Sequence, residues 1–310
     1  MPWTGGWLGS CGGECGPGAG QRHRLRHSAA AREGRVAHSE SARVIALVNQ
    51  KGGCAKTTTA VNLAACLASS GRRTLVIDLD PQANATASLG VDPGGLTRTV
   101  YHVLVGDERD DAGATLAQII VPTTVSNLFL APSSIDLAAA ELELAARIGR
   151  ENSLRKRMGP VLTEYAYIFI DTPPSLGLLT LNALVASDEI IIPIQTHYYA
   201  LLGMRQLLRT LKMVREEVGH QVEILGVLPT MYDSRTNISK EIVQGIKDFF
   251  GDKVFDTAVH FNIKLVESSM VGVPLFMHDP SSRGAQEYMD LAKEVMKGHE
   301  ERARGTAARH

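Results

Sequence analysis

The stretch NQKGGCAKTTTAVN at residues 49–62 is similar to a phosphate-binding loop but departs from the usual pattern G-x-x-x-x-G-K-[ST]. If Lys56 takes the place of the lysine in that pattern, the two glycines of the pattern fall on Gln50 and Ala55. An additional lysine, Lys51, stands near the start of the loop. The stretch is therefore either a degraded phosphate loop or a different device, and the rest of the chain has to decide between them.

The surroundings of the loop favour a working phosphate site. A strand-like run, VIALV at 44–48, precedes it, and a helix is expected over about 57–70. Backbone N–H groups at the start of such a helix face a bound anion. The pair Gly52–Gly53 allows the backbone to approach phosphate closely. Lys56 would then reach the β- and γ-phosphates, and the Thr57 hydroxyl would hold Mg²⁺.

Apolar runs alternate with stretches of helical period from 43 to 297, with no internal repeat or linker. Such buried strands alternating with helices predict a mostly parallel, twisted sheet with helices on both faces. Together with the loop, this indicates one α/β domain of the P-loop NTPase class over 43–297. Besides 44–48, the expected strands are 74–78, 128–131, 167–171, 189–194 and 222–232. Besides 57–70, the expected helices are 135–148, 153–165, 177–186, 200–218, 237–250 and 284–297.

Three aspartates stand at the ends of two of these strands. Asp78 ends the run TLVID, Asp80 follows it two residues later, and Asp171 ends the run YIFID. The carboxyl ends of parallel strands form the edge at which open α/β folds bind ligands. One of the first two carboxylates can organise the Mg²⁺ shell while the other orients an attacking water. Asp171 is placed as a Walker B carboxylate, after a third strand.

Overall composition excludes some classes of protein. The chain has 32 Lys and Arg against 33 Asp and Glu, so net charge predicts neither a nucleic-acid nor a membrane partner. No apolar run reaches about 18 residues, so we expect no transmembrane helix. The four cysteines do not form a disulfide framework, which is typical of a reducing cytoplasm. They are Cys11, Cys15, Cys54 and Cys66.

The two ends of the chain, 1–42 and 298–310, lack apolar periodicity and are expected to be disordered. The first has no apolar core of the kind that a signal peptide requires. Two interpretations of it stay open. It is either upstream sequence translated from a misplaced start codon or a basic DNA-binding arm that carries Arg22, Arg24 and Arg26.

Residues 43–297 resemble the ParA/Soj family of deviant Walker A ATPases, relatives of MinD. KGGCAKT at 51–57 matches the family loop K-G-G-x-x-K-T. Asp78–Gln82 matches D-x-D-P-Q, and Asp171–Ser175 matches D-x-P-P-S. Further matches to chromosomal members are YYAL at 198–201, TMYDSRTN at 230–237 and DPSSRGA at 279–285.

The resemblance implies an ATPase that uses ATP and Mg²⁺ and forms a homodimer when ATP is bound. Its catalytic residues would be Lys51, which reaches the nucleotide of the partner subunit, Lys56, and Asp80, which positions the water. Mg²⁺ would be held by Thr57, Asp78 and Asp171. The implied nucleotide-binding residues are Lys51, Gly52, Gly53, Cys54, Ala55, Lys56, Thr57, Thr58, Thr230 and Met231, the last two beside the adenine.

The resemblance further implies a cytoplasmic, nucleoid-associated partitioning protein without a membrane partner. The ATP-bound dimer would bind DNA without sequence preference, and a ParB-like centromere-binding protein would stimulate hydrolysis and release it. Contacts to phosphates of this kind are sensitive to salt and carry little sequence information. The candidate DNA-binding residues are Arg235, Lys240, Lys247, Lys264 and Arg283.

Several positions depart from the family pattern. Ala55 replaces a usual glycine, which a methyl group tolerates unless the backbone needs a positive φ. P-R-N becomes His260–Asn262, and G-K-P becomes Gly272–Pro274. D-P-R-S-R becomes Asp279–Arg283, and E-Y-Y-A-L-E-G becomes His197–Gly203. Three basic and two acidic positions are thereby lost. We expect intact ATP chemistry, while DNA affinity and partner specificity stay open.

Three alternatives compete with DNA partitioning. A ParA-like ATPase could instead position a protein cargo. The sequence hardly distinguishes this function from DNA partitioning. A MinD-like membrane-surface switch would need an apolar amphipathic helix at the C-terminus, and the tail HEERARGTAARH has no large apolar residue. Reductase chemistry on an Fe–S cluster is excluded, because no cysteine follows Cys66.

Overall fold

The computed structural model describes residues 41–106, 114–197 and 204–307. Most of the N-terminal extension, with Arg22, Arg24 and Arg26, lies outside the described residues, and so does the YYAL match at 198–201. Within the described residues no helix combines the length and the apolar character that crossing a bilayer requires.

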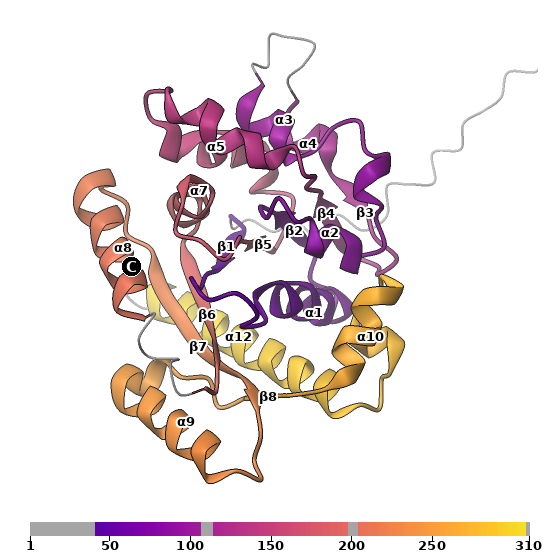
Figure 1. The fold of residues 1–310 in the computed structure, drawn as a ribbon, viewed down its shortest axis with the longest axis vertical. Helices are drawn as coiled ribbons and strands as arrows, with labels where there is room; N and C mark the ends of the chain where they lie inside the picture. Colours follow the sequence, from indigo (N-terminus) through magenta and orange to yellow (C-terminus); the bar gives the residue numbers. More distant parts are fainter. Residues whose placement is uncertain (1–40, 107–113, 198–203, 308–310) are drawn as a thin grey trace, which may run out of the picture. The chain divides into compact units, whose positions relative to one another are not determined.

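One sheet organises the described residues, with the strand order β3-β4-β2-β5-β1-β6-β7-β8 (Figure 1). Neighbouring strands are parallel except at one edge, where β3 runs antiparallel to β4. The predicted mostly parallel α/β architecture is therefore confirmed. The strands are β1 (Arg43–Leu47), β2 (Thr74–Asp78), β3 (Val121–Pro122), β4 (Leu128–Ala131), β5 (Tyr167–Asp171), β6 (Glu189–Gln195), β7 (Glu223–Tyr232) and β8 (Val259–His260).

Every expected helix has a counterpart in the structure. The counterparts are α1 (Lys56–Ser69), α5 (Leu137–Ala145), α6 (Ser153–Met158), α7 (Leu178–Ala186), α8 (Met204–Met213), α9 (Asn237–Phe250) and α12 (Arg283–Ala307). The sequence missed short elements, because two to nine residues carry little periodic pattern. These are β3, β8, α2 (Asn84–Ser88), α3 (Val100–Val105), α4 (Leu116–Ile119), α10 (Ile263–Val271) and α11 (Leu275–His278). The expectation of an unstructured tail from 298 is wrong for 298–307, which continue α12.

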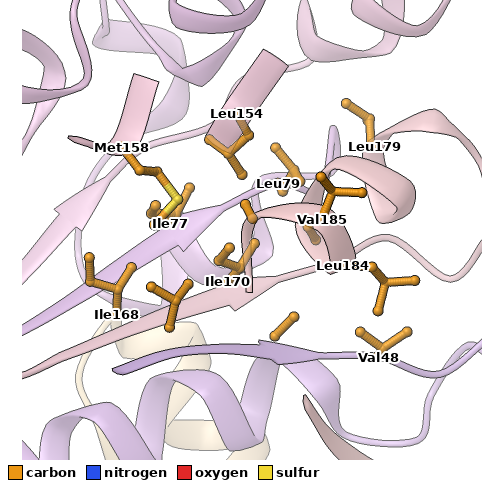
Figure 2. Close-up of a cluster of buried hydrophobic side chains, with 14 of the residues drawn as sticks. Val48, Ile77, Leu79, Leu154, Met158, Ile168, Ile170, Leu179, Leu184 and Val185 are labelled. Atoms are coloured by element: carbon orange, nitrogen blue, oxygen red, sulfur yellow. The ribbon is translucent and has the colours of Figure 1, made fainter. Parts of the chain in front are cut away.

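Residues of β1 alternate between two cores, one on each face of the sheet. Val44 and Ala46 of β1, with Val48 directly after the strand, belong to a cluster that also takes side chains from α3, α5, α6, α7 and α8. Figure 2 shows part of this cluster, where Ile168 and Ile170 of β5 lie beneath α6 and α7. Ile45 and Leu47 belong to the opposite cluster, which α1 and α12 cover. Both faces of the central strands are therefore buried, which explains their continuous apolar sequences.

The core assignment can be tested with a matched pair of isoleucines. Ile168 is fully buried, whereas Ile148 is fully exposed after α5. We expect Ile168→Ala to lower the free energy of unfolding by about 2–5 kcal/mol, because it leaves a cavity between packed layers. Ile148→Ala should change it by no more than about 0.5 kcal/mol. Urea denaturation of both variants measures the difference, and equal losses would contradict the assignment.

Candidate nucleotide site

The site begins with the register of three neighbouring strands. In the pairing of β2 with β5, Asp78 lies opposite Asp171, and in the pairing of β5 with β1, Asp171 lies opposite Leu47. The three strands therefore end at one level of the sheet edge. The glycine-rich loop leaves β1 at this level and leads into α1 at Lys56. The loop and the strand-end carboxylates that the sequence singled out are thus brought together.

The neighbouring strands β6 and β7 hold the loop in place. The Asn49 side-chain amide donates to the carbonyl of Pro193 at 2.7 Å. The Thr230 hydroxyl donates to the carbonyl of Cys54 at 3.1 Å, and both residues are buried. Thr230, which the resemblance places beside the adenine, thus also anchors the loop through its hydroxyl. Burial raises the pKa of the Cys54 thiol, so this cysteine packs under the loop as a neutral group.

Ala55 has a positive φ, which is the backbone condition under which its extra methyl group is expected to cause strain. Its φ is 69° and its ψ is 32°, in the left-handed region, immediately before the first residue of α1. For a residue with a Cβ this conformation costs roughly 1–2 kcal/mol. The methyl group of Ala55 is therefore accommodated only with backbone strain. Glycine, which the family pattern usually has at this position, would adopt the same backbone conformation without strain.

A cavity of about 390 Å³ opens at the loop. Lys56 is buried in its wall, only 7% exposed, while Lys51 is exposed and does not line it. The Lys51 ammonium instead donates to Oε1 of Gln195 at 2.9 Å. The two lysines of the loop therefore stand in different environments. The lining residues are Gly52, Gly53, Ala55, Lys56, Thr57, Thr58, Asp80, Gln82, Asn84, Ser88, Pro174, Met231 and Ser269.

A second cavity, of about 230 Å³, shares Ala55, Thr58, Met231 and Ser269 with the first. Its other lining residues are Thr230, Val259, His260, Phe261, Asn262, Leu265 and Val266. This mostly apolar lining suits a flat ring system, whereas the first cavity is lined by phosphate-binding groups. Sequence reasoning found Thr230 and Met231 but missed the wall formed by β8 and α10, because neither element was predicted.

The position of α10 depends on a close contact between two glycines. Gly272 follows α10 with a φ of +74°, and a Cβ at this residue would lie 2.8 Å from Cα of Gly90, which follows α2. No side chain fits between these backbones. The contact packs α10, which lines both cavities, against α2, which follows the Asp80 loop.

Asp171 is a buried carboxylate at the end of β5. It is fully buried, and neither of its oxygens accepts a hydrogen bond from the described residues. Burial, and then the charge of Asp78, raise its pKa well above the usual value, which Thr57 and Lys56 only partly offset. A bound cation would supply the missing partner, so the residues fit Mg²⁺ between Thr57 and Asp171. Among the described residues no cluster of three or more His, Cys, Asp or Glu side chains could hold a metal, so phosphates and water would complete the shell.

Asp78 does not fit its expected role as a Mg²⁺ ligand. Its Oδ2 accepts from the Thr86 N–H at 2.8 Å and from the Thr86 hydroxyl at 2.7 Å. Its Oδ1 accepts from the Asp80 N–H at 3.1 Å. Burial raises the pKa of Asp78 to about 6, since these hydrogen bonds only partly offset the loss of water. Asp78 therefore positions the segment that carries Asp80.

Asp80 lines the larger cavity and is held at several points. Its Oδ1 accepts from the Gln82 N–H at 2.9 Å, and its carbonyl accepts from the Ser133 hydroxyl at 2.8 Å. Ser133 also donates its N–H to the Thr86 hydroxyl at 3.0 Å. These contacts tie the Asp80 segment to the residues after β4. A fixed carboxylate facing the cavity is placed to orient a water molecule there.

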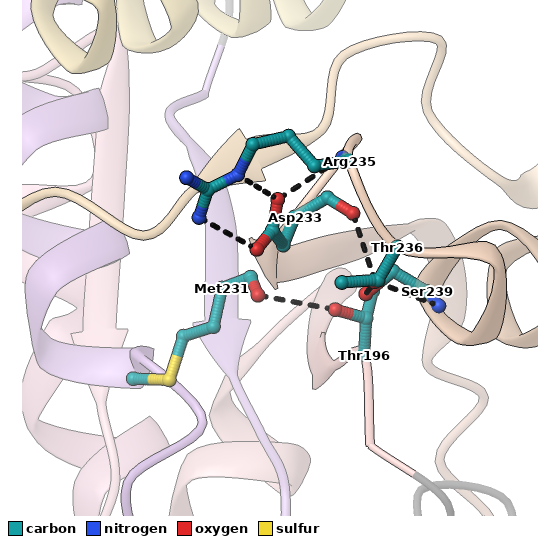
Figure 3. A network of polar contacts seen from close by, with 6 residues as sticks. All are labelled: Thr196, Met231, Asp233, Arg235, Thr236 and Ser239. Atoms are coloured by element: carbon teal, nitrogen blue, oxygen red, sulfur yellow. Dashed lines mark hydrogen bonds and ion pairs between the residues drawn. The ribbon is translucent and has the colours of Figure 1, made fainter.

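Three of the five candidate DNA contacts are engaged with carboxylates of the same chain. Arg235 forms a fork with Asp233, with Nε and Nη2 each 2.9 Å from one carboxylate oxygen (Figure 3). The other two pairs are Lys264 with Glu267, at 2.7 Å, and Arg283 with Glu287, at 2.8 Å. The remaining candidates, Lys240 and Lys247, lie exposed on α9.

Fold and site together define a P-loop ATPase. The family model described as "AAA domain" matches residues 42–224. The chain is 48% identical to sporulation initiation inhibitor protein Soj of Bacillus subtilis over 253 residues, which cover 82% of this chain and 98% of Soj. It is 43% identical to chromosome partitioning protein ParA of Myxococcus xanthus over 255 residues, 82% of this chain and 88% of that protein. The chain belongs to the ParA/Soj family of P-loop ATPases.

Solved structures agree with this assignment. A structure described as cobyrinic acid a,c-diamide synthase from Mycobacterium smegmatis with bound ADP and magnesium is 36% identical. It superposes with a TM-score of 0.72 and covers 84% of this chain and 96% of that chain. The nucleotide and magnesium in that structure accord with the donor set around Lys56, Thr57 and Asp171 here.

The strain at Ala55 predicts an unusual effect of glycine. Ala55→Gly should leave the free energy of unfolding unchanged or raise it by up to about 1.5 kcal/mol, because relief of the left-handed strain exceeds or balances the added chain entropy. The same change at Ala139, an exposed position inside α5, should lower it by about 1 kcal/mol. Chemical denaturation compares the two variants. Equal destabilisation by both would rule out backbone strain at Ala55.

Proposed function

We propose that this ATPase partitions a chromosome or plasmid. Two ATP-bound subunits pair around their nucleotides, the dimer binds DNA without sequence preference, and hydrolysis stimulated by a ParB-like partner releases it. The protein works in the cytoplasm, in association with the nucleoid. The similarity to Soj and ParA proteins along nearly the whole of the described chain supports this proposal.

The observation that carries the proposal is the difference between the two lysines of the loop. Lys56 is buried in the cavity wall, where its ammonium can neutralise phosphates of the same subunit. Lys51 is exposed, outside the residues that line the cavity. An exposed lysine beside a phosphate cavity is available to the nucleotide of a second subunit. Nucleotide contacts then become part of the dimer interface, and loss of the terminal phosphate weakens that interface.

The residues of the cavity supply the steps of hydrolysis. Lys56 and the N-terminus of α1 stabilise negative charge on the phosphates. Thr57 and Asp171 would hold Mg²⁺, which would supply positive charge against the phosphate oxygens. Asp80 orients the attacking water, and Asp78 keeps the backbone of Asp80 in place through a hydrogen bond to its N–H.

The role of Lys51 can be tested by its removal. Lys51→Ala should abolish dimerisation with ATP, because the interface loses its charged contact to the phosphates of the partner subunit. Sedimentation velocity with ATP and with ADP measures the oligomeric state. Lys212→Ala, which changes an exposed lysine of α8, serves as the control and should still dimerise. If the Lys51 variant still dimerises with ATP, then Lys51 does not provide the contact that joins the two subunits through the nucleotide.

The proposed cycle also makes a direct prediction for the unaltered protein. Binding to a random-sequence DNA duplex should be at least about tenfold tighter with ATP than with ADP and should weaken steeply as salt is added. Fluorescence anisotropy of labelled DNA measures both effects. Equal affinity for the duplex with ATP and with ADP would contradict the proposal that the ATP-bound dimer binds DNA. It would favour a different cargo.

A further inference from the structure

We propose that the outer face of α8 is a DNA-contacting surface, formed by Arg205, Arg209 and Lys212, which we call the α8 stripe. This inference rests on the proposed function, because it names the element through which the DNA is held. The stripe is not among the residues that the family motifs indicate.

The two faces of α8 have opposite chemistry. Met204 and Leu207 are buried in the core beneath the helix, while Arg205, Arg209 and Lys212 are exposed. The three cations follow one another at intervals of four and three residues, which places them on one side of the helix. No acidic residue occurs within Met204–Met213. In a chain with a net charge of −1, such a helix is a local concentration of positive charge.

The cations of α8 are largely free to contact an external anion. Within the described part of the chain, Arg205 and Arg209 have no ion pair or hydrogen bond through their side chains. Lys212 lies 3.7 Å from Glu216, and both side chains are more than half exposed, so the pair contributes little. By contrast, Arg235 is held by a two-point fork to Asp233. DNA phosphates would have to displace that carboxylate but would find the arginines of α8 unoccupied.

The spacing of the stripe suits a phosphate backbone. A helix rises 1.5 Å per residue, so Arg205 and Arg209 are about 6 Å apart along its axis, and Lys212 is about 4.5 Å further. Successive phosphates of one DNA strand advance about 3.4 Å along the duplex. The stripe is therefore about as long as three phosphate-to-phosphate steps of one strand. Contacts of this kind read charge and not sequence, as a non-specific DNA-binding protein requires.

The surroundings of α8 favour DNA over a membrane surface. The apolar face of α8 is committed to the protein core through Met204 and Leu207, and the single exposed methionine at its end, Met213, is a poor match for insertion into lipid. The adjacent crossover helix α9 packs into the same core through Ile246 and carries the exposed Lys240 and Lys247. Helices α8 and α9 thus cover one face of the sheet and both present cations to solvent. On α9 the exposed Glu241 and Asp248 offset these lysines, so the net positive charge lies on α8, where a DNA backbone would find it.

The test is a double neutralisation of the stripe in the full-length chain. With ATP present, Arg205→Gln combined with Arg209→Gln should weaken binding to a random-sequence duplex at least about tenfold at low salt. The slope of log affinity against log salt should fall by about 2 for each subunit that contacts DNA. ATP-dependent dimerisation, measured by sedimentation velocity, should be unchanged.

A matched control neutralises two exposed lysines at the same spacing on the opposite side of the sheet. Lys293→Gln combined with Lys297→Gln, on α12, should keep DNA affinity within about twofold of the unaltered protein. DNA binding of the α8 variant equal to that of the unaltered protein would overturn the inference and leave the proposed function standing. Failure of the unaltered protein to bind DNA with ATP would overturn both. An α8 variant that loses only binding to phosphatidylserine vesicles would reassign the stripe to membranes and overturn the inference.

Discussion

The parallel pairing of β1, β5 and β2 in a single register is the constraint on which the rest of the structure depends. Because Leu47, Asp171 and Asp78 lie side by side across these strands, the loop after β1 and both strand-end carboxylates meet at one edge. A shift of one residue in any pair would turn a carboxylate to the other face of the sheet. The two apolar clusters that cover the sheet prevent such a shift, since each alternate residue is committed to one of them. Packing in the core therefore sets the geometry of the polar site.

Much of the architecture could be predicted from sequence because the central strands are buried on both faces and read as continuous apolar runs. The loop at 49–57 and Asp171 could be located for the same reason, since each adjoins such a run. The wall of the smaller cavity could not be predicted. It comes from β8 and α10, and the two residues of β8 are too few for any pattern. The helical end of α12 was missed because its sequence lacks large apolar residues.

The roles of individual polar groups were harder to predict than their positions. Asp78 and Asp171 both end a strand and look equivalent in the sequence. Only the contacts distinguish them: Asp78 accepts three hydrogen bonds from protein groups, and Asp171 accepts none from the described residues. The candidate DNA contacts raised the same difficulty. Whether a surface arginine is available depends on a nearby carboxylate, and for Arg235 that carboxylate is only two residues away.

The buried carboxylate of Asp171 also bears on the lifetime of the folded protein. Burial raises its pKa, and a bound cation would supply the charge balance that the described residues around it do not. A ligand that binds only the folded state lowers the population of opened molecules, and proteolysis in cells often follows that population. If Mg²⁺ and nucleotide bind at this site as proposed, they would therefore also protect the folded chain from proteolysis. One buried side chain would then tie the lifetime of the protein to its ligands.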